Sequence, residues 1–274
     1  MMNLKFWGVR GSIPVPERGF LKYGGNTSCI EISTDEGKLL IFDCGTGIRN
    51  LGKVLIEGSK EGRIEAHILL SHLHWDHTQG LPFFSPLYGK DNSFTFYGRK
   101  YKNSKFSDKV QFQMSDIYFP VPMNKLPSHI NFVEIETESI YIGNTRIDTR
   151  LLRHPGGVLG FRIEYKGKLI TYATDNEPRK GHIDQNLLYL AGNTDILIFD
   201  SQYTPEEYES GKRGWGHSTW LEAVKVSKEA GVKKLILFHH DPNHNDKFVD
   251  DIVERARGHF ENTIGAKEGM ELIL

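Results

Sequence analysis

The heptapeptide SHLHWDH at residues 71–77 decides the fold of this chain, because it places four metal-ligand side chains within six positions. It directly follows an apolar run that predicts a β-strand. Since alternate side chains of a strand point the same way, His72 and His74 are expected to converge on one point. Asp76 and His77, entering the next turn, are expected to reach a neighbouring point. Imidazole and carboxylate donors without thiolates suit a zinc site that is not purely structural.

Four further candidate ligands follow other predicted strands. Asp43 ends one apolar run, and His154 comes shortly after a second. Asp175 and His239 directly follow two more. Loops at strand ends commonly carry the functional groups of α/β proteins, whereas core residues would lie within the strands. His240 is an alternative to His239, although alternation along the strand points the two side chains in opposite directions.

Strand patterns dominate both halves of the chain, and helical patterns lie between and after them. The predicted strands are 4–9, 29–33, 39–43, 67–71, 94–97, 147–152, 159–165, 168–174, 196–200 and 234–238. Helices are predicted from a capping-box pattern at 219–222 to residue 230, and over 246–257. This alternation predicts an α/β sandwich with two sheets inside and helices outside. No repeat or long linker interrupts the sequence, so residues 1–274 are expected to form a single domain.

An aromatic and basic segment at about 88–127 stands apart from the strand patterns. Between residues 90 and 109 it carries six Lys or Arg against two Asp. One interpretation is a solvated hairpin and loop whose aromatic side chains pack on the sandwich. The alternatives are a cover over the active site, with aromatic rings to stack on a base and cations to meet phosphate, or a subunit interface.

Charge and cysteine content exclude several classes of protein. The 274 residues include 34 Lys and Arg against 35 Asp and Glu, so the net charge is −1 and no overall field favours a polyanion. We find no apolar run of signal-peptide or membrane-spanning length, and therefore expect a cytoplasmic protein without membrane partners. The two cysteines form no disulfide framework, in keeping with a reducing compartment. The twelve histidines are the unusual feature of the composition.

The order and strand-end placement of these ligand-type residues resemble the signature of the metallo-β-lactamase superfamily. The resemblance extends from residue 4 to the last predicted helix. It implies an αββα four-layer sandwich, in which two mixed β-sheets are flanked by helices and a dinuclear metal site lies at one sheet edge.

The resemblance also implies a role for each candidate. It assigns His72, His74 and His154 to a first metal. It assigns Asp76, His77 and His239 to a second metal, Asp175 to a bridge between the two, and Asp43 to orienting a ligand. For Asp43 the alternative is an acid that caps the turn at Gly45. The implied cofactors are two divalent ions, with Zn²⁺ favoured by ligand type and Mn²⁺ or iron as alternatives.

A second motif indicates the branch of the superfamily. The sequence GHST at residues 216–219 resembles an element of the ribonuclease Z-like phosphodiesterase branch, which includes cyclic-phosphate phosphodiesterases. The resemblance implies that His217 stabilises the phosphate and protonates the leaving group, while Asp76 also orients the nucleophile. Asp76 and His217 are therefore the candidate catalytic residues. The alternative for His217 is a solvated or capping residue before the helix.

The predicted substrate class depends on one difference between this sequence and the ribonuclease Z-like branch. Its tRNA-processing ribonucleases carry a long arm between the elements that match His154 and Asp175, and here that interval is 21 residues. The leading prediction is therefore a dinuclear-zinc phosphodiesterase acting on a small phosphodiester such as a cyclic nucleotide. The alternatives are a ribonuclease Z-like RNA 3′-processing endonuclease, then a lactonase or thioesterase, then a di-iron redox protein or a noncatalytic metal-binding regulator. His74 argues against the di-iron class, which typically carries glutamate there. Nucleic acid is thus not the favoured partner, and a homodimer remains an alternative to a monomer.

Overall fold

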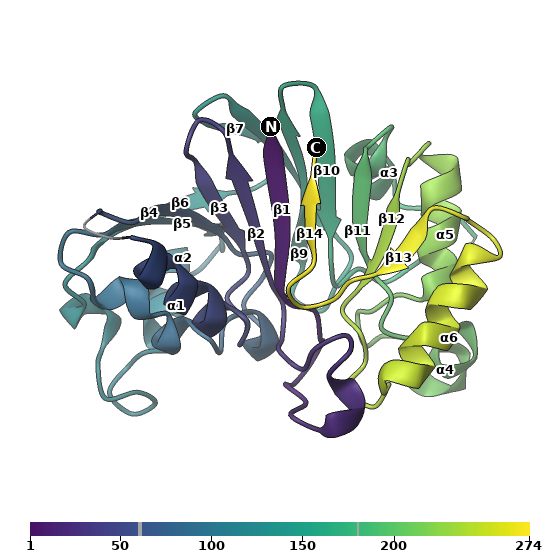
Figure 1. The fold of residues 1–274 in the computed structure, drawn as a ribbon, viewed down its shortest axis with the longest axis horizontal. Helices are drawn as coiled ribbons and strands as arrows, with labels where there is room; N and C mark the ends of the chain where they lie inside the picture. Colours follow the sequence, from purple (N-terminus) through teal and green to yellow (C-terminus); the bar gives the residue numbers. More distant parts are fainter. Residues whose placement is uncertain (60–61, 180) are drawn as a thin grey trace.

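In the computed structural model, which describes residues 1–59, 62–179 and 181–274, two seven-stranded sheets lie face to face (Figure 1). The first sheet has the order β14-β1-β2-β3-β4-β5-β6. Its strands are β1 (Met2–Gly8), β2 (Cys29–Thr34), β3 (Leu39–Phe42), β4 (Glu65–Leu69), β5 (Ser93–Arg99), β6 (His129–Ile135) and β14 (Glu271–Ile273). Pairing is antiparallel from β14 to β3 and parallel from β3 to β6.

The second sheet repeats this plan with the order β13-β12-β11-β10-β9-β8-β7. Its strands are β7 (Ser139–Ile142), β8 (Thr145–Leu152), β9 (Val158–Tyr165), β10 (Lys168–Ala173), β11 (Ile196–Asp200), β12 (Leu235–Phe238) and β13 (Thr263–Gly265). Pairing is antiparallel from β7 to β10 and parallel from β10 to β13. Parallel strands end at the same edge, so both sheets present a row of carboxyl ends there.

Helices cover the outer faces of both sheets (Figure 1). The first sheet carries α1 (Ile48–Gly58) and α2 (Phe106–Phe112), and the second carries α3 (Gln185–Ala191), α5 (Trp220–Glu229) and α6 (Asp246–Arg257). A short helix α4 (Pro205–Glu207) continues into a π-helical turn at Tyr208–Lys212. Helices α5 and α6 begin at the caps Thr219 and Asn245, whose side chains accept backbone N–H groups. The four layers confirm the predicted fold class.

The core between the sheets is aromatic at its centre. The ring of Phe42 on β3 lies 5.3 Å from Phe161 on β9 and 5.8 Å from Tyr172 on β10, edge to face in both cases. Tyr172 also contacts Phe238 on β12 in the same way. These side chains are buried, so the two sheets are held together by apolar packing directly behind the edge where the carboxyl ends lie.

All ten predicted strands overlap observed strands, and both predicted helices are present. The strand predicted over 67–71 ends earlier, at Leu69, so residues 70–74 lie in a loop. Strands β6, β7, β13 and β14 and helices α1, α2, α3 and α4 were not predicted. Strand β6 is largely exposed at the sheet edge and so lacks a clear apolar pattern, and α1 follows Gly47, which offers no side-chain cap.

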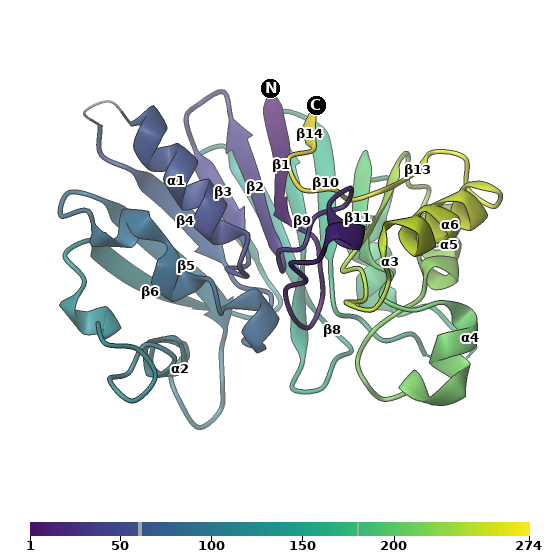
Figure 2. The same ribbon diagram turned by 60° about the horizontal axis from the view of Figure 1, so that its bottom comes forward.

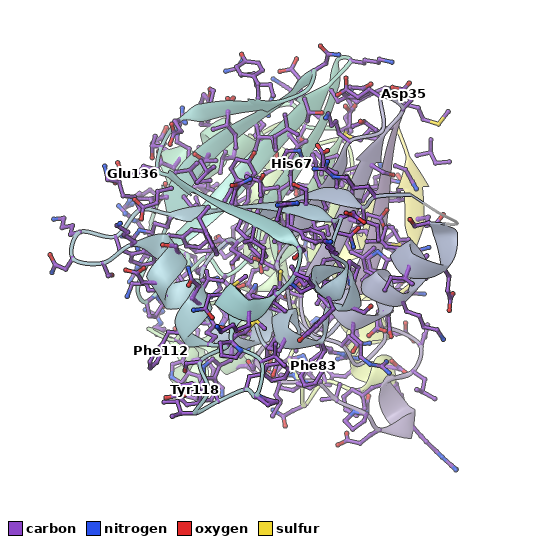
Figure 3. All side chains as sticks on the ribbon, turned by 90° about the vertical axis from the view of Figure 1, so that its left-hand side faces the viewer. Asp35, His67, Phe83, Phe112, Tyr118 and Glu136 are labelled. Carbon is purple, nitrogen blue, oxygen red and sulfur yellow. The ribbon has the colours of Figure 1, made fainter. Side chains whose placement is uncertain are left out.

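The aromatic and basic segment at 88–127 is partly integral to the first sheet. It contains β5, which pairs in parallel with both β4 and β6, and then α2 on the outer face. A hairpin interpretation of this segment is therefore wrong, because β5 and β6 are connected by a crossover. Its exposed side chains include Phe112 and Tyr118, whose rings pack against each other and which are both labelled in Figure 3. Within the described ranges, no helix combines the length and apolar composition that a membrane span requires.

Candidate metal centre

The predicted ligands come together at the edge where the carboxyl ends of both sheets meet, which Figure 2 brings toward the viewer. Asp43 and His239 directly follow β3 and β12, and Asp175 lies two residues after the end of β10; their φ angles are 62°, 62° and 51°. This left-handed conformation is uncommon for residues other than glycine. It turns each of the three side chains out of its strand and into the space between the sheets.

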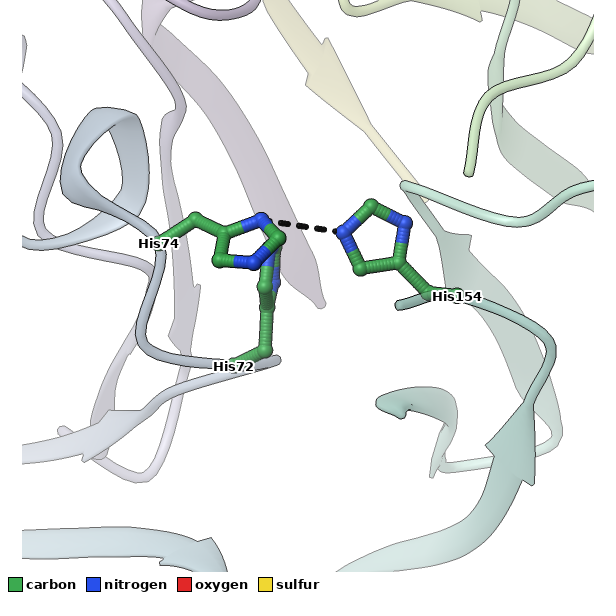
Figure 4. Close-up of side chains that lie close together, drawn as sticks. All are labelled: His72, His74 and His154. Atoms are coloured by element: carbon green, nitrogen blue, oxygen red, sulfur yellow. Dashed lines mark hydrogen bonds between the residues drawn. The ribbon is translucent and has the colours of Figure 1, made fainter. Parts of the chain in front are cut away.

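The first donor set consists of His72, His74 and His154 (Figure 4). Nε2 of His154 lies 3.0 Å from Nδ1 of His74, and the ring of His72 packs against both at centroid distances of 4.4 and 4.7 Å. Nδ1 of His154 contacts the carbonyl oxygen of Gly216 at 2.8 Å, which makes Nδ1 the donor and leaves a lone pair on Nε2. Burial lowers the pKa of all three imidazoles and keeps them neutral.

His72 supplies the observation that tests whether this set fits a metal. Its Nε2 is buried and has no hydrogen-bond partner among the described residues. A buried polar atom without a partner is costly, and a neutral imidazole nitrogen is a ligand that divalent metals prefer. The unpartnered Nε2 of His72 lies beside the neutral rings of His74 and His154, and these three imidazoles together fit a divalent cation.

The second donor set consists of Asp76, His77, Asp175 and His239, all of them buried. Nε2 of His77 lies 3.2 Å from Nε2 of His239 and 3.2 Å from Oδ2 of Asp175, and Nε2 of His239 lies 3.2 Å from Oδ2 of Asp76. Burial opposes the charge of His77, but the neighbouring carboxylates outweigh burial and raise its pKa well above the usual range. The carboxylates around His77 therefore favour a positive charge at this position.

Asp175 stands between the two sets and turns one oxygen toward each. Its Oδ1 lies 3.8 Å from Nε2 of His72 and 4.0 Å from Nε2 of His154. Its Oδ2 lies 3.2 and 3.4 Å from Nε2 of His77 and His239. Ligands about 2.1 Å from a tetrahedral zinc ion lie about 3.4 Å apart. The spacing of both sets is close to this value, so the residues fit two adjacent divalent ions that share Asp175.

Hydrogen bonds fix the orientation of the second-set imidazoles. Oδ2 of Asp43 accepts from Nδ1 of His77 at 2.8 Å and from the hydroxyl of Tyr172 at 2.7 Å. Oε1 of Gln202 lies 2.9 Å from Nδ1 of His239. Because both Nδ1 atoms are engaged, both Nε2 atoms face the centre. Asp43 itself makes no contact with the turn at Gly45, whose N–H donates to the Ser28 carbonyl.

His217 lies beside the second set, just before α5. Its Nδ1 contacts Oδ2 of Asp200 at 3.0 Å and lies 3.6 Å from Oδ1 of Asp175. Burial opposes a charge on His217, but the carboxylates of Asp200 and Asp175 outweigh burial and raise its pKa to about 9. The two carboxylates therefore favour the charged form of the ring.

The comparisons with known proteins place this geometry in a family. A family model described as "Beta-lactamase superfamily domain" matches residues 39–240. The chain belongs to this family. A protein named Ribonuclease Z from Thermoplasma volcanium is 25% identical in an alignment that covers 98% of this chain and 96% of that protein.

Two solved structures share the fold of this superfamily member over nearly their whole length. The metallo-beta-lactamase fold protein YhfI from Bacillus subtilis has a TM-score of 0.73 and 20% identity, covering 99% of this chain and 98% of YhfI. The short form of human tRNase Z has a TM-score of 0.68 and 18% identity, with the same coverage. The chain is thus a metal-dependent hydrolase of the metallo-β-lactamase fold, and this family implies divalent metal ions as cofactors.

Three contacts of this hydrolase site were not predicted from the sequence. They are the Asp200–His217 pair, the Gln202–His239 contact, and a hydrogen bond of 2.7 Å from the backbone N–H of Ser12 to Oδ2 of Asp76. Asp200 ends a predicted strand, as Asp43 does, so the same strand-end rule could have found it. His240 points away from the site, with Nε2 contacting the Ala266 carbonyl oxygen at 3.0 Å.

A pocket of about 360 Å³ leads from the surface to the donor sets. It is lined by Ser12, Leu73, His74, Trp75, Asp76, Asp175 and His217. The pocket therefore exposes one donor of the first set, the Asp175 carboxylate and the His217 ring to the same volume. A substrate in it would meet the metal ligands and a proton donor together.

Proposed function

We propose that this superfamily member hydrolyses phosphodiester bonds at a dinuclear metal centre, with RNA as the substrate class. The observation that carries the proposal is the pair of donor sets that share Asp175, with His217 beside them and in contact with Asp200. Relatives named Ribonuclease Z align over almost their entire length, which supports the RNA alternative better than the small phosphodiester that the sequence favoured.

The chain supplies four donors to each of the two proposed metal sites. His72, His74 and His154 would hold the first ion, Asp76, His77 and His239 the second, and Asp175 both. All are nitrogen or oxygen donors, which suit Zn²⁺ and also accept Mn²⁺ or iron. When bound, two such ions activate water at neutral pH and neutralise the charge of a phosphate.

The protein's own groups supply proton transfer and orientation. Asp200 accepts a hydrogen bond from Nδ1 of His217, which leaves the protonated Nε2 to donate to the leaving oxygen of the substrate. Oδ2 of Asp76 is held by the N–H of Ser12, so its other oxygen remains to orient the attacking water. His217 is therefore the proposed general acid, and Asp76 the proposed orienting carboxylate in addition to its role as a ligand.

A small phosphodiester remains a second candidate because of one specific observation. Residues 154–175, all of which the structure describes, contain only the hairpin of β9 and β10. The alignment with the Thermoplasma ribonuclease spans 313 positions, whereas this chain has 274 residues, so at least 39 positions of the alignment have no counterpart here. A substrate without a large RNA body would not need the missing surface.

A turnover screen of metal-loaded protein tests the proposal. The substrates are a tRNA precursor with a 3′ trailer, bis-p-nitrophenyl phosphate, 3′,5′- and 2′,3′-cyclic nucleotides, a lactone and a thioester. We expect metal-dependent cleavage of the precursor and of bis-p-nitrophenyl phosphate. Cleavage of cyclic nucleotides alone would move the substrate class to the second candidate. Hydrolysis of only the lactone or thioester, or a characteristic iron absorption band without hydrolysis, would overturn the phosphodiesterase proposal.

A further inference from the structure

Trp75 is a large aromatic side chain that the apolar core does not explain. It stands between the ligands His74 and Asp76 in the sequence, yet 80% of its surface is exposed. Exposed indole at the mouth of a polar site offers a flat surface for an aromatic ligand. Its backbone is fixed by a 3₁₀ turn at Trp75–His77, so the ring position is tied to that of the ligands.

A groove of about 440 Å³ continues outward from the metal pocket. It is lined by Leu73, Trp75, Asp108, Lys109, Phe112 and Gln113. Leu73 and Trp75 also line the metal pocket, so a molecule bound at the metals can extend into the groove without leaving the surface. Its volume is within the range of ligand-binding pockets. We call this hollow the α2 groove, because its outer wall belongs to α2.

The outer wall of the α2 groove carries a second exposed aromatic ring. Phe112 is 58% exposed and packs edge to face on Tyr118, with ring centroids 5.4 Å apart, as Figure 3 illustrates. The contact with Tyr118 orients Phe112 while leaving it open to solvent. The groove thus has an aromatic side chain on each of its two walls, one from the ligand turn and one from α2.

The groove lining carries one cation, Lys109, and one acid, Asp108, and the chain segment that leads into it is basic. The stretch 99–109 carries five Lys or Arg and one Asp, in a chain whose net charge is −1. Within the described parts of the chain, none of these five cations has a carboxylate oxygen within 4.0 Å. Lys109, which lines the groove, instead lies over the ring of Tyr101 at 4.8 Å. Cations without carboxylate partners beside aromatic rings suit a molecule that combines phosphate with a base.

We propose that the α2 groove binds the nucleotide next to the scissile phosphate, with its base between Trp75 and Phe112 and its outer phosphate near Lys109. This inference rests on the proposed phosphodiesterase function and specifies which part of the substrate the protein recognises. Stacking requires an unpaired base, so the groove selects single-stranded substrate. Aromatic stacking accepts every base, and the groove therefore recognises a nucleotide without reading its sequence.

Binding of AMP to the metal-loaded protein tests the groove without catalysis. AMP is a phosphomonoester, and ribose 5-phosphate is its matched ligand without a base. We expect AMP to bind about 5- to 150-fold more tightly than ribose 5-phosphate, as measured by calorimetry. Equal binding of the two ligands would overturn the proposal, because the base would then make no contact.

Single-residue variants distinguish the contribution of the groove to AMP binding from that of the metal ligands. Phe112→Ala changes α2, far in sequence from any ligand, and should reduce the preference for AMP to less than half of its value. Trp75→Ala should do the same with metal content unchanged, whereas Trp75→Phe should retain most of the preference. The matched control is Tyr141→Ala, which removes a ring that is 68% exposed on β7 and should change nothing. A preference that survives Phe112→Ala would also overturn the proposal.

A substrate series distinguishes failure of the groove from failure of the proposed function. If the protein hydrolyses no phosphodiester but prefers AMP in the way described, the proposed function fails and the groove stands. If it cleaves RNA, an abasic residue beside the scissile phosphate should lower kcat/KM for the wild type and have little effect on Phe112→Ala. The same loss in both proteins would show that the base is recognised elsewhere, and the groove would then be refuted.

Discussion

Asp43, Asp175 and His239 show how single residues place the site, because each combines a strand end with a left-handed backbone. Such conformations cost of order 1–3 kcal/mol and persist only where surrounding contacts hold them. Asp43 has these contacts, since its carboxylate accepts hydrogen bonds from the backbone and hydroxyl of Ser71 as well as from His77 and Tyr172. The unfavourable backbone of Asp43 is thus held by hydrogen bonds that also orient His77.

Replacement of Asp175 should reduce metal binding while the fold is retained. Asp175→Ala removes the carboxylate whose two oxygens face the two donor sets, so the metal content should fall to one ion or none per chain. Metal analysis after gel filtration measures this change. Asp251→Ala, at an exposed position of α6, is the control and should retain the wild-type content. Two tightly held ions in the Asp175 variant would refute the bridging role.

The Asp200–His217 pair should act as one unit in catalysis. His217→Ala should retain both metals and lose about 10²- to 10⁴-fold in the rate on bis-p-nitrophenyl phosphate, because the proposed proton donor is gone. Asp200→Ala should also slow the reaction, and the double variant should be no slower than His217→Ala alone. His129→Ala, exposed on β6, provides the control. Independent, multiplying losses would contradict a shared role.

At the scale of elements, most strands were predictable, whereas the meeting of their ends at the site was not. Short apolar runs ended by Gly, Asp, Asn or Pro were enough to find ten strands, because buried strands tolerate little else. The convergence of His72 and His74 was expected for the wrong reason: β4 ends at Leu69, and a loop with a 3₁₀ turn at Trp75–His77 brings them together. Strand alternation therefore does not explain the first donor set.

The missing parts of the prediction depend on contacts between distant segments. Ser12 and Gln202 reach ligands that are 64 and 37 residues away along the chain, and neither lies in a motif that marks it. Helix α3 begins at Asp184 with a cap that accepts only from Asn186, without a capping box. A local pattern carries no information about which strand ends meet across two sheets. The family resemblance supplied that information, which spacing alone could not.

Helix α5 begins at a capping residue that lies two positions after His217, the proposed general acid, and this arrangement can be tested with two caps. The Oγ of Thr219 and the Oδ1 of Asn245 accept backbone N–H groups at the starts of α5 and α6. Thr219→Ala and Asn245→Ala should each lower the free energy of unfolding by about 1 kcal/mol in urea titrations. Only Thr219→Ala should also slow turnover, since His217 lies two residues before that cap. Equal turnover in both variants would show that the cap does not position His217.

At the scale of the whole molecule, the metal donors are divided between the two sheets. His72, His74, Asp76 and His77 follow a strand of the first sheet, whereas His154, Asp175 and His239 follow strands of the second. Neither sheet carries a complete donor set. The hydrogen bond from Tyr172 on β10 to Asp43 after β3 also crosses between the sheets, directly behind the donors. Bound ions would therefore join the halves of the sandwich at one edge.

Removal of the metals should lower thermal stability because the ions bind the folded state. At free metal about 1,000-fold above its dissociation constant, binding adds about 4 kcal/mol to the free energy of unfolding. For a chain of this size that corresponds to roughly 8–16 °C in Tm. Calorimetry with and without a chelator measures the shift, and Asp175→Ala should show little of it. An unchanged Tm in the wild type would mean that the ions do not bridge the sheets.

Because the donors come from both sheets, the size of ion that fits between them depends on how far apart the core holds the two sheets. The separation of the sheets is set by rings such as Phe42 and Phe161, whereas the ion must reach donors on both sides at its own preferred distances. Phe161→Leu should let the sheets approach slightly, and so weaken the larger Mn²⁺ more than Zn²⁺ in competition titrations. Leu187→Ala, on the outer side of the second sheet, should leave the ratio unchanged. Apolar core residues that do not contact the ion would then determine which metal binds more tightly.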